Sequence, residues 1–234
     1  MLDWATVRGF RQGDNPARWR GQLSHLLPAP AKVSTVAHHA ALPYVEIGAF
    51  MASLDGRDAI AARALEFTIL TAARTGEVIG ATWGEIDLEE ATWTIPGERM
   101  KAGKVHKVPL SGPALAILRT MAKHRQGEIV FPGARGNALS NMTMTMLLRR
   151  MEYGDMTVHG FRSSFRDWAA ERTAFPNEVV EMALAHTVGN KVEAAYRRGD
   201  LFDKRRKLMD HWAEFCATLS AERGATVVPL RKVV

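Results

Sequence analysis

Two arginines and one tyrosine, far apart in the chain, are the residue types that cleavage of a phosphodiester without a metal requires. Arg74 ends a long apolar segment, and Arg162 lies in a His-Gly-Phe-Arg sequence. Tyr196 is followed by Arg197 and Arg198, which are candidates for contact with nucleic acid. A guanidinium donates two hydrogen bonds to a phosphate and stays charged at any working pH. The reaction also needs a nucleophile and a proton donor for the leaving oxygen.

Tyr196 is the candidate nucleophile, and two histidines are candidates for proton transfer. A tyrosine phenol has a pKa of about 10, so it needs a base and neighbouring cations to react at neutral pH. His159 precedes Arg162 by three residues, which places both on one face of a helix predicted to begin near Thr157. His186 precedes Tyr196 by ten residues. We interpret His159 as a proton acceptor and His186 as a donor to phosphate, although each, taken singly, also fits a structural role.

A lysine in the loop of a predicted hairpin is the candidate general acid. Residues 98–104 read Glu-Arg-Met-Lys-Ala-Gly-Lys, and a lysine at such a tip can reach the leaving oxygen. Lys101 is our prediction for this role and Lys104 is the alternative, while both also fit simple contacts with backbone phosphates. Glu77, three residues after Arg74, is a candidate structural partner for that arginine.

The composition favours a globular protein that binds a polyanion. The chain has 234 residues, 47% of them hydrophobic, which suffices for one full-sized domain and an appendage. Its net charge of +6 makes nucleic acid the leading partner and a membrane surface the second. No apolar run reaches the roughly 18 residues of a spanning helix and the N-terminus does not resemble a signal peptide, so we expect a cytoplasmic protein. The single cysteine, Cys216, excludes an internal disulfide and is expected to pack in a late helix.

The chain changes character near residue 38. Residues 1–38 carry frequent glycine and proline and little apolar periodicity, so we interpret them as a linker or the remnant of an upstream core-binding domain. Residues 39–219 are the predicted catalytic domain, and residues 220–234 are a C-terminal tail.

The predicted domain is of the α+β class, mainly helical with one small sheet. Apolar residues at helical spacing after Pro43 predict one helix, and Asp58 is expected to cap the next, an apolar helix over 60–73 that delivers Arg74. Short alternating segments predict an antiparallel sheet in the middle of the chain. The elements expected after residue 80 are strands at 85–88, 92–95 and 104–110, a helix over 114–123, a strand-like segment at 129–131 and helices within 140–219.

Taken in order, these residues resemble the catalytic domain of a tyrosine recombinase of the phage integrase family. The resemblance covers about residues 40–215 and rests on several motifs in the right order rather than on any one. Ala72 departs from the pattern, because many members have glycine there. The matching residues are Arg74, Glu77, Trp83, Glu85, Lys101, His159, Arg162, Leu184, His186 and Tyr196.

The resemblance implies the DNA breaking-rejoining fold and a reaction that uses no cofactor. Tyr196 attacks the scissile phosphate, giving a 3′-phosphotyrosine and a free 5′ hydroxyl, while the two arginines and His186 hold the phosphate. Lys101 protonates the leaving oxygen, and His159 assists proton transfer at the tyrosine. The implied function is site-specific integration or excision of a mobile element.

The implied partners are double-stranded DNA with its attachment sites and other protomers of a tetrameric synaptic complex, although a catalytic domain alone can be monomeric. The terminal helix, over 201–212, has apolar residues that fit either a neighbouring protomer or packing within the molecule. No membrane partner is expected.

Two other functions use similar residues. A type IB topoisomerase relaxes supercoils with much the same groups, and a non-catalytic remnant would occupy integrase sites without cutting them. A metallonuclease is not supported, because His38, His39 and the scattered acidic residues do not form a ligand cluster.

Overall fold

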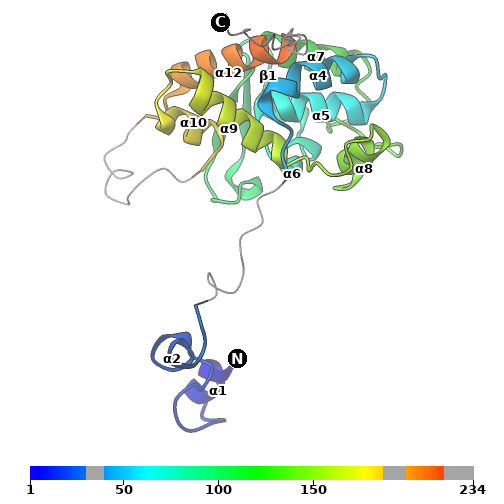
Figure 1. Ribbon diagram of the computed structural model, residues 1–234. Helices are drawn as coiled ribbons and strands as arrows, with labels where there is room; N and C mark the ends of the chain where they lie inside the picture. The colour runs from blue at the N-terminus through cyan, green and yellow to red at the C-terminus, as the bar shows by residue number, and fades with distance from the viewer. Residues whose placement is uncertain (30–39, 187–198, 219–234) are drawn as a thin grey trace, which may run out of the picture. The chain divides into compact units, whose positions relative to one another are not determined.

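A computed structural model describes three stretches of the chain, residues 1–29, 40–186 and 199–218 (Figure 1). Its contacts divide the chain into two units, Met1–His38 and His39–Val234.

The first unit consists of short helical segments. None of its described residues is buried, and Trp4, Val7 and Phe10 are among its exposed apolar residues. As expected, such short segments do not enclose a core. They are α1 (Leu2–Val7), η1 (Trp19–Leu23) and α2 (Ser24–Leu26).

The second unit is mainly helical with a three-stranded antiparallel sheet, which confirms the predicted fold class. Among the residues that the structure describes, no helix is both long and apolar enough to cross a membrane. Its elements are η2 (Tyr44–Glu46), α4 (Ile47–Asp55), α5 (Ile60–Thr71), α6 (Thr75–Ile79), η3 (Trp83–Glu85), β1 (Ile86–Asp87), β2 (Thr92–Ile95), η4 (Gly97–Arg99), β3 (His106–Pro109), α7 (Gly112–Lys123), α8 (Thr143–Arg150), α9 (Gly160–Arg172), α10 (Asn177–Ala183) and α12 (Phe202–Ala217).

Helix α5 is the centre of this unit. It contacts α4, α7, α8 and α12, and its residues Leu65, Phe67 and Ile69 are buried. A helix that is apolar on nearly all sides is expected in such a position. The end of α5, which leads into Arg74, is therefore fixed by the core.

The start of α5 differs from the prediction that Asp58 caps it. The N-cap residue is Ala59, and no described side chain caps this end. The amide of Arg57 donates to the carbonyl of Leu54 at 3.0 Å, and the amide of Ala59 donates to Arg57 at 3.0 Å. These bonds wind the connection between α4 and α5 tightly, so the N-cap position falls at Ala59, one residue after Asp58.

The sheet has the order β1-β2-β3, with two residue pairs between β1 and β2 and four between β2 and β3. Strand β1 is shorter than predicted because Glu85 belongs to the helical turn η3. The strand-like segment at 129–131 is not a strand of the sheet, since Ile129 forms only an isolated bridge with Thr82.

Two glycines allow the loop between β2 and β3 to close. Gly103 has a positive φ of +66°, a conformation that side chains disfavour. A Cβ on Gly97 would lie 2.8 Å from the carbonyl oxygen of Gly103, so a larger residue would push the two sides of the loop apart. This loop carries the candidate general acid, Lys101.

Helix α9 begins at Gly160, three residues later than predicted, because Thr157 caps it from outside. The Thr157 hydroxyl accepts a hydrogen bond from the Gly160 amide at 3.0 Å. A Cβ on Gly160 would collide with the carbonyl of Ala40, and the Ser164 hydroxyl donates to the carbonyl of Leu42. The start of the helix that carries Arg162 is thereby packed directly on the backbone of residues 40–42.

Helix α12 uses its apolar face within the molecule, which decides between the two predicted uses of that face. Helices α9, α10 and α12 lie side by side (Figure 1). Trp212 of α12 packs on Trp168 of α9 with ring centroids 4.9 Å apart, and its indole donates to the carbonyl of Ile69 at 2.8 Å. Cys216 is buried in the same helix, and burial raises the pKa of its thiol.

We expect Gly160→Ala to destabilise the protein, because its new methyl group would overlap backbone atoms that cannot rotate away. The loss should be about 1 to 3 kcal/mol in the free energy of unfolding, measured by urea denaturation. Gly112→Ala is the control, since a Cβ there meets no atom within 4 Å. Equal stabilities for the two variants would contradict the close packing described above.

Candidate active site

Arg74 and Arg162, far apart in sequence, meet at the carbonyl group of Leu184. Nη2 of Arg162 donates to this oxygen at 2.6 Å, and Nη2 of Arg74 donates to it at 3.4 Å. Arg74 also donates to the carbonyl of Ala185 at 3.3 Å. Arg74 is the N-cap residue of α6 and Arg162 lies in the first turn of α9, so three helices bring the two guanidinium groups together.

Glu77 holds Arg74 in place. One carboxylate oxygen accepts from the Arg74 backbone amide at 2.8 Å, and the other accepts from Nη1 of the same residue at 2.7 Å. Glu77 is buried, whereas the Arg74 side chain stays 24% exposed. The pairing fixes one edge of the guanidinium and leaves part of it open to solvent.

Arg99 links this turn to the sheet. It donates to the carbonyl of Glu77 at 2.5 Å and forms an ion pair with Glu85, which also accepts from the indole of Trp93 at 3.0 Å. Gly80 leaves room for the arginine, because a Cβ there would lie 2.8 Å from its Nη2 atom. Arg99 is not among the residues predicted from the sequence, because nothing in the sequence relates it to Glu77.

Two alanines with left-handed backbone present the carbonyls that the arginines need. Ala72 ends α5 with φ 48° and ψ 27°, and its carbonyl accepts a hydrogen bond from Nη1 of Arg162. Ala185 has φ 49°. The amides of Ala185 and His186 donate to Met182 and Glu181, the bond pattern of a Schellman motif. Glycine is favoured at such positions, which is a physical reason for the glycine that many members of the family have where this chain has Ala72.

Arg162 is buried and remains a cation. Burial, followed by the nearby charge of Arg74, lowers the pKa of its guanidinium to about 10, while Glu77 and Glu181 act in the opposite direction. It donates hydrogen bonds to the carbonyls of Ala72 and Leu184 and to the ring of His186. Its buried Nε atom has no acceptor among the described residues. The site therefore keeps a desolvated positive charge.

Glu181 orients His186. Because a guanidinium has only donors, Nε2 of His186 accepts from Arg162 at 3.2 Å, and the proton of the neutral ring lies on Nδ1. Nδ1 lies 2.7 Å from one carboxylate oxygen of Glu181 and donates to it, and the second carboxylate oxygen lies 2.8 Å from Nε of Arg166. Glu181 is not among the residues predicted from the sequence, because only the left-handed turn at Ala185 brings it to His186, five residues later.

The remaining predicted residues are exposed or lie outside the described residues. His159 is the exposed N-cap residue of α9. Lys101 and Lys104 are exposed in the loop between η4 and β3. The three predicted residues outside the described ranges are Tyr196, Arg197 and Arg198.

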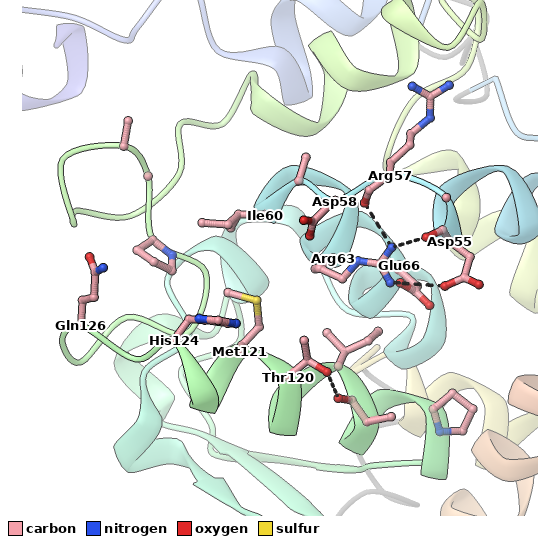
Figure 2. Close-up of a pocket in the computed structure, with 18 residues that line it drawn as sticks. Asp55, Arg57, Asp58, Ile60, Arg63, Glu66, Thr120, Met121, His124 and Gln126 are labelled. Atoms are coloured by element: carbon pink, nitrogen blue, oxygen red, sulfur yellow. Dashed lines mark hydrogen bonds and ion pairs between the residues drawn. The ribbon is translucent and has the colours of Figure 1, made fainter.

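The hollow drawn in Figure 2, with a volume of about 980 Å³, is not this site. It is lined by residues from the start of α5 and from α7, and none of the predicted site residues lines it. Its charges pair with each other, since Arg63 lies 2.6 Å from Glu66 and 3.7 Å from Asp55. The candidate site is recognised by its converging cations.

We expect Ala72→Gly to stabilise the protein by up to about 1 kcal/mol, because glycine adopts the left-handed conformation without steric cost. Thermal unfolding measures the change. The neighbouring substitution Ala73→Gly is the control; Ala73 has no positive φ, so it should lose a comparable amount. Destabilisation by both variants would contradict the strain assigned to Ala72.

We expect the stability of the protein to fall between about pH 6.5 and pH 4 because of His106 in β3. Burial, followed by the charge of Arg205, lowers the pKa of this histidine to about 4; Arg74 acts in the same direction, while Glu77 and the Ala183 backbone oppose it. As the pH falls, the unfolded chain takes up the proton first, so the folded state loses at most about 3 kcal/mol.

The measurement is urea denaturation across this pH range. His106→Gln should flatten the slope, whereas the same substitution at His124, exposed at the end of α7, should leave it unchanged. An unchanged slope in His106→Gln would contradict the assignment.

Comparison with known proteins places this geometry in a family. The profile described as the phage integrase family matches residues 42–201. Prophage integrase IntA of Escherichia coli (strain K12) is 38% identical over 164 residues, which cover 68% of this chain and 39% of IntA. The integrase of Enterobacteria phage P4 is 32% identical over 200 residues, which cover 76% of this chain and 45% of that protein. The chain thus spans about half or less of the length of these relatives.

Solved structures share the fold. A lambda integrase (75-356) dimer bound to a COC′ core site has a TM-score of 0.57 at 17% identity, covering 80% of this chain and 68% of that one. The integrase from mycobacterium phage Brujita has a TM-score of 0.57 at 18% identity, covering 89% and 67%. Since the family profile matches more than half of the sequence, the chain belongs to the phage integrase family and carries a tyrosine recombinase catalytic domain.

Proposed function

We propose that this chain cuts and rejoins DNA through a 3′-phosphotyrosine intermediate, as the catalytic domain of a site-specific recombinase. The observation that carries the proposal is the convergence of Arg74 and Arg162 on the carbonyl of Leu184. Two guanidinium groups held side by side are suited to the two non-bridging oxygens of one phosphate.

The charge balance of the cluster matches a phosphodiester. Glu77 is paired with Arg74, and Glu181 is paired with Arg166 and His186. Among the described residues, no carboxylate forms a hydrogen bond with Arg162, so this buried cation stays uncompensated there. A phosphodiester carries one negative charge, and its binding would relieve the cost of burying that cation.

The proposed reaction is a transesterification that conserves bond energy. The phenol oxygen of Tyr196 attacks phosphorus, and His159 accepts the phenol proton. The bond from phosphorus to the 5′ oxygen breaks as Lys101 gives that oxygen a proton. In the reverse step, a 5′ hydroxyl attacks the phosphotyrosine and releases the tyrosine, so rejoining needs neither ATP nor a metal.

His186 and Glu181 complete the phosphate site. His186 donates to the phosphate from Nε2 when its ring is protonated, and Glu181 stabilises this imidazolium through Nδ1. In this state, the hydrogen bond from Nε2 to a phosphate oxygen would replace the hydrogen bond that Nε2 accepts from Arg162 in the structure. Lys104, Arg197 and Arg198 are proposed contacts with the DNA backbone.

The proposed partners are double-stranded attachment sites and further protomers. The related lambda integrase has been solved as a dimer bound to a COC′ core site and as a tetramer bound to a Holliday junction. Because that similarity is at 17% identity, it supports the fold, and the assembly of the present chain is a proposal.

A library of nicked duplexes with a randomised core tests the proposal without knowledge of the attachment site. We expect the parent protein to form a covalent adduct in the presence of EDTA, recovered under denaturing conditions, and Tyr196→Phe to form none. Arg162→Lys should lower the rate of adduct formation by about 10²- to 10³-fold, because one head group cannot reproduce the fork of hydrogen bonds. Arg172→Lys, exposed at the end of the same helix, is the matched control and should keep the parental rate.

The other outcomes identify the other functions. Retention of the library by the parent without an adduct would assign a DNA-binding role alone. Relaxation of a supercoiled plasmid without strand exchange between paired sites selected from the library would assign a topoisomerase activity. An adduct with Tyr196→Phe would exclude this tyrosine as the nucleophile.

A further inference from the structure

Arg205, in the first turn of α12, holds Asp200 in place just before that helix begins. Nε of Arg205 donates to the carbonyl of Asp200 at 2.8 Å, and its Nη2 donates to the carboxylate of the same residue at 2.9 Å. Its Nη1 donates to the carbonyl of Lys107, in β3, at 2.6 Å. One guanidinium therefore clamps the start of α12 to the sheet.

Making this connection with Arg205 requires the burial of a charged side chain, which costs free energy of desolvation. The residue is only 2% exposed, and burial lowers the pKa of its guanidinium while Asp200 opposes that shift. Replacing a buried ion pair by apolar residues is often neutral or stabilising, so stability alone does not explain a buried arginine. The planar guanidinium instead fixes the position of Asp200 relative to the carbonyl of Lys107 in β3, because it donates to both.

Strand β3 is a firm support for this clamp. It pairs with β2 along four residue pairs, and Val108 within it is buried. The same strand continues the loop that carries Lys101. His106 precedes Lys107 in this strand and lies close to the backbone of Ala183, which acts to raise the pKa of the histidine. Adjacent residues of β3 are thus close to Ala183, just before the His186 turn, and to the anchor at Asp200.

The position of this anchor matters for Tyr196, which precedes Asp200 by four residues. Four extended residues span at most about 14 Å, so the anchor bounds the region that the tyrosine can reach. Attack on phosphorus requires near-attack geometry, and a displacement of about 1 Å can cost about 10²-fold in rate.

We propose that Arg205 is a positioning residue for the nucleophile: by tying Asp200 to the carbonyl of Lys107, it fixes the backbone four residues after Tyr196. The inference rests on the proposed function, and Arg205 itself need not touch DNA. It predicts a defect in the covalent step that is separate from DNA binding.

The test uses the full chain, the nicked duplexes recovered with the parent, and three variants. Arg205→Met removes the hydrogen bonds that hold Asp200. Asp200→Asn weakens them by removing the negative charge, and it leaves the core unchanged because the Asp200 side chain is exposed. Lys204→Met is the matched control, because it removes a positive charge from the adjacent exposed position of α12. The readouts are DNA affinity, the rate of adduct formation at saturating protein and hydrogen exchange of the amides of residues 199–206.

We expect Arg205→Met to form the adduct about 10- to 100-fold more slowly than Lys204→Met, with DNA affinities equal within about twofold. Asp200→Asn should fall between them, and exchange at residues 199–206 should be faster in both anchor variants. If Arg205→Met does not fold, the rate of adduct formation by Asp200→Asn, compared with that of Lys204→Met, tests the inference.

Adduct formation by both anchor variants at the control rate would overturn the inference while leaving the proposed function intact. An equal loss of affinity and rate would assign Arg205 to DNA binding and would also overturn it. Failure of the parent itself to form an adduct would instead refute the proposed function.

Discussion

The candidate site depends on the fact that a helix ends with carbonyl groups that have no partner within the helix. These groups carry partial negative charge, and they suit cations that would otherwise be buried without acceptors. Arg162 uses the ends of two helices at once, since it donates to Ala72 after α5 and to Leu184 after α10. Arg74 joins it at Leu184. Two like charges can lie together because the protein surrounds them with oriented dipoles rather than with an excess of carboxylates.

The two helix ends act as acceptors only because each turns through the left-handed region. Ala72 and Ala185 adopt this conformation without being glycine, at a cost of roughly 1 to 2 kcal/mol each. Strain of this kind concentrates at functional sites, where the surrounding packing enforces it. Here the packing comes from α5, which is buried against α4, α7, α8 and α12, and from Glu77 and Glu181, which hold Arg74 and His186.

The sheet has a supporting role that its small size conceals. Through Arg99 it fixes the turn of Arg74 and Glu77, and through Arg205 it fixes the start of α12. Both arginines donate to backbone carbonyls and pair with one carboxylate each, Glu85 and Asp200. Side chains that look like surface charges in the sequence are therefore structural connections between elements, whereas Arg162 forms no hydrogen bond with a carboxylate among the described residues.

The sequence by itself determined the residue types of the site, their order, the fold class and most of the helices and strands. Those features are local, because the apolar period, the turn residues and each motif involve residues that are close together in the sequence. Tertiary structure alone decided that Glu181 orients His186, that Ala59 replaces Asp58 as the cap of α5, that Ile129 forms only a bridge, and that α12 packs inward. It also decided which carbonyls receive the guanidinium groups. Every residue has the same backbone acceptor, so composition cannot distinguish Leu184 from its neighbours, and only the path of the chain brings that oxygen to both arginines.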